Sequence, residues 1–544
     1  MKWLACSVLA LMACTNASEV DETGETDTGE TGTVVEPTWC ETQGLTEHAF
    51  ETEGEFGFRR RQLAEDFEIT LLDGTSWRLS DHWTGCDATV FIPHYFPVGA
   101  TDNSSVWTTG VSELIERSAP NSRYIFFVAG NNAAQIADFA EPLQADIDNT
   151  LATLTDEEAA WWADRLLVSG QVTGEMDNWI KILFSTDVGT YGMGIDRFQR
   201  VRPLGSLATV EAYNPSTPDG EWPFDRRLFS AAYEARYWNY EARRQVELDA
   251  VEATEVVLWE KSVHEEYEDI TITLPTAEEM EGYDTLEIDV LMECPDPAGY
   301  EPGNCGPWDY LAYMWLRDEA DTSWMEMARF ITTYHRESRW VVDASHALPW
   351  IKEGGDRTLR YEWAPSWNKQ PSSLTVKLRL SNHGKEVKPV ETVPLFGGGG
   401  FGSTYNDREP VVVSIPADAK KVELVALTTG HGMDKGNCAE FCDQKHEFTV
   451  GTAVHVQDLN APGDDTYCAE DVDNGTVPNQ LGTWWFGRSG WCPGREVYPF
   501  VIDVTSDVSL GSDASVSYRG LYQGSTPADG HGNIKHNSWI VIHK

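Results

Sequence analysis

Asp309 follows a segment in which two cysteines enclose a loop rich in proline and glycine. Between Cys294 and Cys305 stand three prolines and two glycines, which exclude a helix or a central strand. A disulfide between these cysteines would fix the exit of the loop and direct the carboxylate of Asp309, beside the indole of Trp308. Residues 310–316 are mostly apolar and predict a buried strand. A carboxylate held in this way can transfer protons, and the alternative is a solvated acid at a turn.

A second carboxylate stands between two closely spaced cysteines, in the sequence Cys438-Ala-Glu440-Phe-Cys442. A disulfide here would restrain little chain entropy, so its value would be the fixed direction of Glu440. Glu362, followed by Trp363, is a third acid in a tryptophan-flanked strand. Acids among aromatic side chains suit a carbohydrate site, because aromatic faces stack on sugars and carboxylates accept hydroxyl protons or activate water. The alternative is that most of the tryptophans are core residues.

The charge of the chain limits its partners. The formal net charge is −48, from 88 acidic and 40 basic residues. Phosphate binding needs basic patches, so nucleic acid is excluded as a partner. The acids are spread along the chain, which favours a highly solvated surface over a specific cation site. The length of 544 residues predicts several domains with cores of their own.

The first residues are typical of an export signal. Residues 1–14 contain one basic residue, Lys2, a short apolar run and the sequence Leu11-Met-Ala-Cys14, which resembles a bacterial lipoprotein signal with its lipobox. We therefore expect an exported lipoprotein at the outer membrane, on its periplasmic face or at the cell surface. Cys14 would carry the lipid, the only predicted contact with a membrane. The alternative is an ordinary secretory signal.

Residues 15–38 predict a disordered acidic tether, because they are rich in Glu, Asp, Thr and Gly and contain no basic residue. No later apolar stretch approaches the length needed to span a bilayer.

The cysteines beyond Cys14 predict a disulfide framework, since their count is even and the chain is expected to be exported. Proximity in the sequence favours the pairs Cys40–Cys86, Cys294–Cys305, Cys438–Cys442 and Cys468–Cys492, although the sequence alone does not determine connectivity. Zinc is the alternative. No CxxC pair or Cys/His cluster has ligand spacing, so we expect no metal and no cofactor.

Residues 39–215 predict an α/β domain. Residues 67–79 predict a hairpin around Asp73-Gly74, and the segments 87–93 and 123–128 predict short strands. A capping box at Thr155 opens a predicted helix, and residues 194–202 predict a returning hairpin. This order resembles a thioredoxin-like domain. The segment that would hold its redox cysteines, residues 95–107, contains none, which predicts a redox-inactive role. Residues 216–254 predict a helical linker.

From residue 255 onward, short strands alternate with Gly, Pro, Asn and Asp punctuation and no helices intervene. This texture predicts antiparallel β sandwiches, and a break near residues 382–384 predicts two of them, at 255–384 and 385–544. The expected fold class is therefore multidomain, with a thioredoxin-like α/β domain followed by two antiparallel jelly rolls.

Five ordered sequence blocks between residues 255 and 544 carry a family resemblance. They are Cys294…Cys305-Gly-Pro-Trp308-Asp309, Glu326-Met-Ala-Arg329-Phe-Ile331-Thr, Gly430-His431, Cys438-Ala-Glu440-Phe-Cys442 and Arg488-Ser-Gly-Trp491-Cys492-Pro-Gly494. In this order they resemble the peptide-N-glycosidase F family, whose members are built from two jelly rolls. The resemblance implies Asp309 as the principal catalytic acid, with Glu440 and, less securely aligned, Glu362 as further acids. It implies a substrate cleft lined by Trp308, Tyr310, Ile331, Trp363, His431, Arg488 and Trp491.

The activity that this resemblance implies is hydrolysis of the amide between N-acetylglucosamine and the Asn side chain of an N-glycosylated peptide or protein. The glycan would leave intact and Asp would remain. The chain departs from the family pattern in having Tyr310 directly after the acid, where the family has Arg, and Gly306-Pro307 in place of an acid. One alternative is a surface glycan-binding lipoprotein with weak or no turnover. Another is a copper monooxygenase on a similar fold, which is disfavoured because none of the 13 histidines forms a His-His or His-x-His pair.

Overall fold

The strands between residues 253 and 381 form two antiparallel sheets, with the orders β10-β17-β12-β15 and β11-β16-β13-β14. Inward side chains alternate along β12 and β13, where Ile288, Val290, Ala312 and Met314 join one buried cluster. Residues at every second position of a strand face the same side, so this cluster is the core between the two sheets. The bounds are β10 Ala253–His264, β11 Tyr267–Thr276, α7 Ala277–Met280, β12 Thr285–Glu293, β13 Leu311–Arg317, β14 Trp324–Ile331, β15 Ser338–Asp343, α8 Leu348–Ile351, β16 Gly354–Glu362 and β17 Ser372–Ser381.

A second sandwich follows between residues 389 and 543, with sheets β18-β25-β20-β23 and β19-β24-β21-β22. Leu424, Ala426, Phe448 and Val450 lie in its core. The prediction of two antiparallel jelly rolls is confirmed, and the first sandwich ends close to the predicted break. The bounds are β18 Pro389–Gly400, β19 Val411–Ser414, β20 Lys421–His431, β21 Gln444–Val450, β22 Ala453–Leu459, α9 Tyr467–Glu470, β23 Phe500–Asp503, β24 Asp513–Tyr522 and β25 Asn533–His543.

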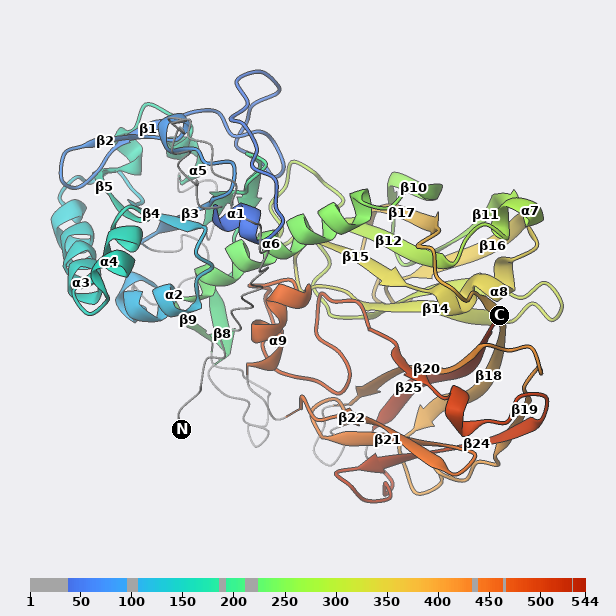
Figure 1. Ribbon diagram of the computed structural model, residues 1–544. Helices are drawn as coiled ribbons and strands as arrows, with labels where there is room; N and C mark the ends of the chain where they lie inside the picture. The colour runs from blue at the N-terminus through green and yellow to red at the C-terminus, as the bar shows by residue number, and fades with distance from the viewer. Residues whose placement is uncertain are drawn as a thin grey trace, which may run out of the picture. The chain divides into compact units, whose positions relative to one another are not determined.

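The computed structural model of the chain describes residues 38–94, 106–184, 192–210, 224–432, 439–462, 466–530 and 532–544. The two sandwiches can be followed from yellow-green to red in Figure 1. The predicted lipidation site Cys14, the tether and Cys438 lie outside the described residues. Within the described part of the chain, no helix is both long and apolar enough to cross a membrane.

The residues before the sandwiches contain a mixed five-stranded sheet of order β5-β4-β3-β6-β7. Strands β3, β4 and β5 are parallel to one another, and β6 pairs antiparallel with both β3 and β7. The predicted hairpin around Asp73 and the capping box of Thr155 with Glu158 are both present. That this part is thioredoxin-like stays a prediction. The bounds are α1 Trp39–Thr42, β1 Glu68–Thr70, β2 Ser76–Arg78, β3 Ala88–Pro93, α2 Val111–Arg117, β4 Ser122–Val128, α3 Glu141–Leu151, α4 Asp156–Ala163, β5 Leu166–Val172, α5 Ile180–Leu183, β6 Met193–Ile195, β7 Val201–Pro203, β8 Ala208–Val210 and β9 Phe224–Arg226.

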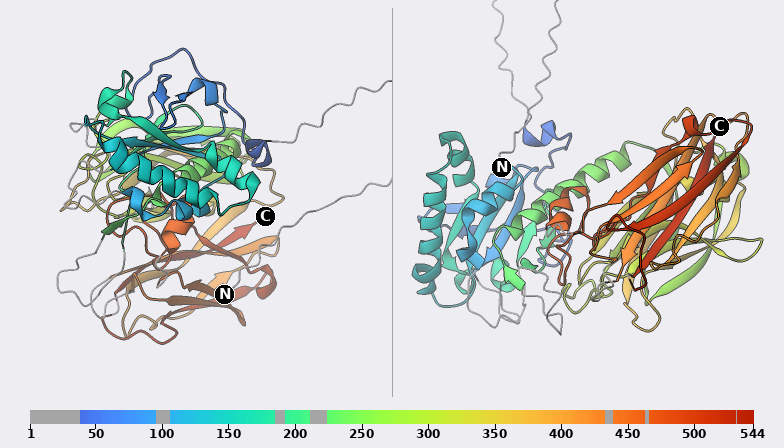
Figure 2. Two further views of the ribbon diagram at one scale, coloured as in Figure 1. Left: turned by 90° about the vertical axis from the view of Figure 1, so that its left-hand side faces the viewer. Right: turned by 90° about the horizontal axis from the view of Figure 1, so that it is seen from below.

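Helix α6, Ser230–Asp249, occupies the predicted linker but is a packed element. Ala231 and Ala235 join the core formed by β3, β4, α2 and α3, whereas Tyr233 packs with Trp484 and Trp485 of the second sandwich. Near its C-terminal end, Arg244 donates to the backbone oxygen of Arg339 in β15 at 2.7 Å. The helix therefore contacts all three sheet systems, and the views of Figures 1 and 2 show it, in green, running between them.

Candidate functional site

Asp309 lies just before β13, at the end of the loop that the Cys294–Cys305 disulfide closes. Its two neighbours are held by their backbones. The Thr332 hydroxyl donates to the oxygen of Trp308 at 2.6 Å and accepts from the amide of Tyr310 at 2.7 Å. The amide of Trp308 also donates to the side-chain oxygen of Gln370 at 3.1 Å. These contacts fix the backbone on both sides of Asp309 and so direct its carboxylate.

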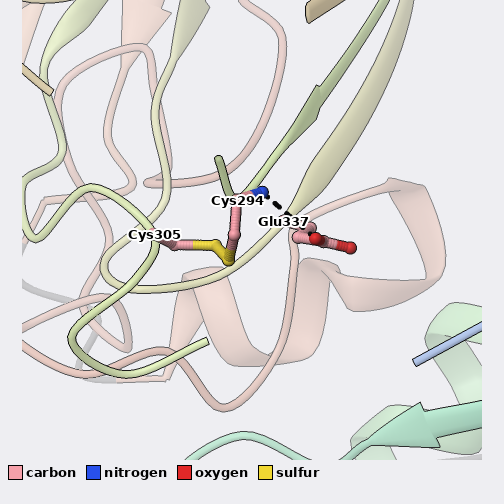
Figure 3. A group of neighbouring side chains, drawn as sticks. All are labelled: Cys294, Cys305 and Glu337. Carbon is pink, nitrogen blue, oxygen red and sulfur yellow. Dashed lines mark hydrogen bonds between the residues drawn. A yellow bond between two sulfur atoms is a disulfide. The ribbon is translucent and has the colours of Figure 1, made fainter. Parts of the chain in front are cut away.

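The disulfide loop does not form a metal site. Cys294, Cys305 and Glu337 offer potential ligand atoms within 4.8 Å of one another, but the two sulfurs are bonded to each other (Figure 3). The Cys294 amide donates to Glu337 at 3.1 Å, and Arg61 pairs with the other oxygen of that carboxylate at 3.0 Å. The group is thus a structural anchor for the loop. The disulfides Cys40–Cys86 and Cys468–Cys492 are also present as predicted.

Glu440 comes from the second sandwich and is held by the segment that carries Arg488. Its amide donates to the oxygen of Gly432 at 3.1 Å, and its own carbonyl accepts from the amide of Ser489 at 2.9 Å. The Ser489 hydroxyl donates to the oxygen of Cys442 at 2.8 Å. Cys442 is disulfide-bonded, while its predicted partner Cys438 lies outside the described residues.

Arg488 joins the two acids. Its Nε donates to Oε1 of Glu440 at 3.1 Å, and its Nη2 lies 3.6 Å from Oδ2 of Asp309. The guanidinium is fully buried and lies between the rings of Phe441 and Trp491, 5.1 and 4.8 Å from their centroids. In contrast, 17% of the Asp309 side chain and 14% of the Glu440 side chain are exposed. The cluster therefore combines two partly exposed acids with a fully buried cation.

The turn after Arg488 depends on a glycine. Gly490 has a φ of +82°, and a Cβ added there would lie 2.4 Å from the backbone oxygen of Thr428. Only glycine allows this close approach, which returns the chain so that Trp491 covers the guanidinium.

Burial changes the acid–base properties of both carboxyl groups. It raises the pKa of Asp309, although the Arg488 charge and the nearby Tyr334 hydroxyl, acting as a donor, favour the ionised form. Burial also raises the pKa of Glu440 to about 7, and the charge of Asp309 adds to this rise while Arg488 opposes it. Two interacting acids titrate as a pair, so one proton can be held between them near neutral pH. This is the range in which a carboxyl group can act as acid and as base.

Tyr334 and Thr483 belong to the cluster, and the sequence did not single them out. The Arg488 Nη2 donates to the hydroxyl of Thr483 at 2.8 Å, and the Tyr334 and Thr483 hydroxyls are 3.4 Å apart. The proximity of Asp309 adds to the effect of burial in raising the pKa of Tyr334 well above its ordinary value. The sequence did contain one signal for Tyr334, which stands two residues after the block that ends at Thr332. Because β13 and β14 are antiparallel, the residues after β14 lie at the same end of the pair as Asp309, which precedes β13.

The predicted third acid lies apart from this pair. Glu362 stands opposite Tyr313 across the β13–β16 pair and accepts from the indole nitrogen of Trp315 at 3.2 Å. Tyr313 is four residues beyond Asp309, which places Glu362 ~13 Å away along the strand. Among the described residues, no hydrogen bond or ion pair joins Glu362 to Asp309, Glu440 or Arg488, so its predicted catalytic role lacks support from a contact.

Several predicted substrate contacts are buried. Ile331 and Trp363 have no exposed surface, and Trp491 is almost completely buried. The Trp363 indole donates to the oxygen of Gln370, and that of Trp491 to the oxygen of Gly430. His431 stacks on Trp491 with ring centroids 5.2 Å apart. The prediction that Ile331 and Trp363 contact the substrate is therefore wrong, because both are core residues. Trp491 packs against the guanidinium of Arg488.

Exposed aromatic side chains adjoin Asp309. Trp308 is 49% exposed and Trp367 is 79% exposed. The ring of Tyr310 lies edge-on to Trp367 at 6.1 Å, and its hydroxyl accepts from the amide of Asn368 at 2.7 Å. The site therefore combines paired carboxylates with an aromatic rim, which suits a sugar better than a charged ligand.

Part of the chain is similar to known proteins. Residues 402–543, which include Glu440 and Arg488, match the family described as Peptide-N-glycosidase F, C terminal. The chain is also 26% identical over 259 residues to peptide-N(4)-(N-acetyl-beta-D-glucosaminyl)asparagine amidase F of Elizabethkingia miricola, covering 43% of this chain and 67% of that protein. The chain is thus similar in sequence to peptide-N-glycosidase F over part of its length. The family resemblance predicted from the sequence blocks is confirmed.

Solved structures of peptide-N-glycosidase F resemble the same part of the chain. A crystal structure of peptide-N(4)-(N-acetyl-beta-D-glucosaminyl) asparagine amidase is 20% identical, with 54% of this chain and 96% of that chain covered and a TM-score of 0.43. PNGase F of Flavobacterium meningosepticum is also 20% identical, with the same coverage and a TM-score of 0.41. The fold of this chain follows from its own strand pairing.

Proposed function

We propose that this chain hydrolyses the amide that joins N-acetylglucosamine to the Asn side chain of N-glycosylated peptides or proteins. The observation that carries the proposal is the position of Asp309 and Glu440. They come from different sandwiches, share the buried Arg488, and have side chains that are each partly exposed. The kinship with peptide-N-glycosidase F supports the same chemistry.

The reaction divides naturally between the two acids. A water molecule attacks the side-chain carbonyl carbon of the substrate Asn, and Asp309 accepts its proton. The C–N bond then breaks, and the leaving nitrogen must take up a proton to depart as a glycosylamine. Glu440, with a pKa of about 7, can hold that proton and return it. The water oxygen stays on the peptide, so Asn becomes Asp. Arg488 fixes the distance between the acids and balances their charge.

The exposed rim would bind the sugar that adjoins the amide. Trp308 and Trp367 offer flat apolar faces next to Asp309, and sugar rings stack on such faces through their C–H groups. The same rim supports the second candidate, a glycan-binding lipoprotein with little or no turnover. In this chain Tyr310 stands directly after the acid, and its hydroxyl accepts a hydrogen bond from Asn368.

Incubation with a denatured high-mannose glycoprotein distinguishes these two candidates. We expect release of intact glycans and conversion of the modified Asn to Asp, measured by mass spectrometry of the peptides. Glycan binding without release at any pH would establish the second candidate.

We further propose that the protein is exported and anchored by a lipid at Cys14, and a Cys14→Ser variant should then appear in the soluble fraction.

A further inference from the structure

The loop of residues 478–486 forms one wall of the proposed site, and the residues behind it come from α6 and the N-terminal sheet. Thr483 in this loop contacts Arg488, and the ring of Tyr334 packs directly on it. A Cβ at Gly482 would lie 2.8 Å from that ring. The amide of Tyr334 donates to the side-chain oxygen of Gln480 at 2.9 Å. The positions of the Thr483 hydroxyl, which contacts Arg488, and of the Tyr334 hydroxyl, which contacts Asp309, thus depend on where this loop lies.

Glu234 of α6 ties the loop from behind. It is completely buried, and its Oε1 accepts from Asn479 at 2.9 Å and from Arg336 at 2.5 Å. Asn479 also donates to the backbone oxygen of Ser230 at 2.9 Å, which is the first residue of α6. Ser206 adds a third tie, because its amide donates to the oxygen of Asn479 at 2.7 Å. These three hydrogen bonds join Asn479 to the start of α6 and to the segment after β7, and so restrain where the loop lies.

Arg336 connects the same anchor to the other wall of the site. Besides Glu234, it donates to the oxygen of Pro478 at 2.6 Å and to Glu301 at 3.1 Å. Glu301 lies inside the disulfide-closed loop that precedes Asp309, and Arg336 is only two residues beyond Tyr334. One buried guanidinium therefore contacts α6, the 478–486 loop and the loop that directs Asp309.

The apolar contacts run in the same direction. Tyr334 belongs to a buried cluster that contains Phe229 and Tyr233 near the start of α6 and Trp484 and Trp485 from the loop. The rings of Tyr233 and Trp485 are 5.6 Å apart. Loss of the α6 contacts would leave this aromatic wall of the site without its backing.

We propose that Glu234 and Asn479 are positioning residues, through which α6 and the N-terminal α/β part hold Tyr334 and Thr483 against the catalytic acids. This inference rests on the proposed function, and it gives the part without redox cysteines a role as a clamp on the site. The catalytic side chains lie in the two sandwiches, but their geometry depends on residues outside them.

The test compares two variants with a matched control on the same helix. Asn479→Gly removes the side-chain tie and suits the left-handed backbone of this residue, whose φ is +49°. Glu234→Gln keeps the shape and the acceptor oxygen but removes the charge. Arg236→Gln is the control, because Arg236 also links α6 to the second sandwich, through Asp473 at 2.6 Å, but its hydrogen bonds among the described residues go to Asp473 and Glu470 and none to the 478–486 loop.

We expect both positioning variants to lower kcat about tenfold with KM nearly unchanged, since a small misplacement of catalytic groups is enough. The control should keep the wild-type kcat. Combined with Tyr334→Phe, Asn479→Gly should lose less than the two separate effects multiplied together, because part of each effect acts through the Tyr334 hydroxyl. Unchanged kcat in both positioning variants, or fully additive losses in the combined variant, would overturn the proposal.

A second readout does not depend on turnover. A fluorotyrosine placed at Tyr334 reports its surroundings by fluorine NMR in the full chain. Its signal should shift or broaden in Asn479→Gly and Glu234→Gln but not in Arg236→Gln. An unchanged signal in both variants contradicts the positioning role even if the wild type releases no glycan. A wild type without release, combined with a shifted signal, contradicts the proposed function alone.

Discussion

Two buried arginines in this chain each hold carboxylates, and they do so in different ways. Arg329 donates two parallel hydrogen bonds, of 2.8 and 2.9 Å, to the two oxygens of Glu326, and both side chains are almost completely buried. Asn537 also donates to Glu326 at 2.5 Å, and Thr429 and the oxygen of Lys535 take the remaining Arg329 donors. Every group in that cluster has a partner, so it joins the two sandwiches and leaves nothing for a ligand.

Arg488 instead holds two acids with one bond of 3.1 Å and one looser contact of 3.6 Å. Its other donors go to Thr483 and the oxygen of Phe486, and the side chains of both acids are partly exposed. A buried arginine with fully paired acids is thus structural, whereas incomplete pairing beside partly exposed side chains leaves acids able to react.

The largest expected effect separates the two clusters by activity. Asp309→Asn keeps the shape of the side chain but cannot accept a proton, so we expect glycan release to fall at least ~10³-fold. The unfolding temperature should change little, because Asp309 makes only a loose contact with Arg488, at 3.6 Å. Release rates and thermal unfolding of the same preparation check this, and a variant with wild-type rates would remove Asp309 from the chemistry.

The converse change should affect stability and not chemistry. Arg329→Met leaves Glu326 buried without its partner, which we expect to lower the free energy of unfolding by about 3 kcal/mol or more. Chemical denaturation measures this cost. The double variant Arg329→Met with Glu326→Met serves as the control and should recover much of the loss, whereas an unstable double variant would show that the pair itself is indispensable.

Glu440→Gln should make the stability of the protein depend on pH in a different way. The pKa of Glu440 is raised from 4.5 to about 7 in the folded state, so the folded protein keeps a proton that the unfolded chain has released between those values. Wild-type stability therefore falls as pH rises through this window, by about 3 kcal/mol at most. We expect the variant to unfold like the wild type at pH ~4.5 and to be the more stable protein at pH ~8. A gain that is equal at both pH values would contradict the raised pKa.

Tyr334→Phe should have the smallest effect, a fall in kcat of about tenfold or less, as expected for one lost hydrogen-bond donor. Because the hydroxyl lowers the pKa of Asp309, its loss should raise that pKa further and move the acidic limb of the pH–rate profile to higher pH. The profile of kcat against pH measures this shift. A shift to lower pH would mean that the hydroxyl does not stabilise the ionised Asp309.

The sequence predicted the sandwiches because strand alternation and turn residues are local signals, as in residues 310–316, which correspond to β13 Leu311–Arg317 within one residue. It also singled out Asp309, Glu440 and Arg488, since cysteines and ordered blocks mark them. It missed Tyr334 and Thr483, because their roles depend on contacts between distant segments. It placed Ile331 and Trp363 in the cleft. Ile331 is instead buried in a cluster with residues of the second sandwich, and Trp363 in the core of the first, and no local pattern records these contacts.

Hydrolysis in water enriched in heavy oxygen shows whether this chain cleaves the side-chain amide of glycosylated Asn. After incubation of an N-glycosylated peptide with the wild-type chain, we expect the peptide to carry one heavy oxygen in a new Asp side chain and to have lost its entire glycan. The Asp309→Asn variant, run in parallel, should leave the peptide unchanged. A product that keeps one N-acetylglucosamine on Asn, or an unchanged peptide with the wild type, would contradict the assignment of Asp309 and Glu440 to amide hydrolysis.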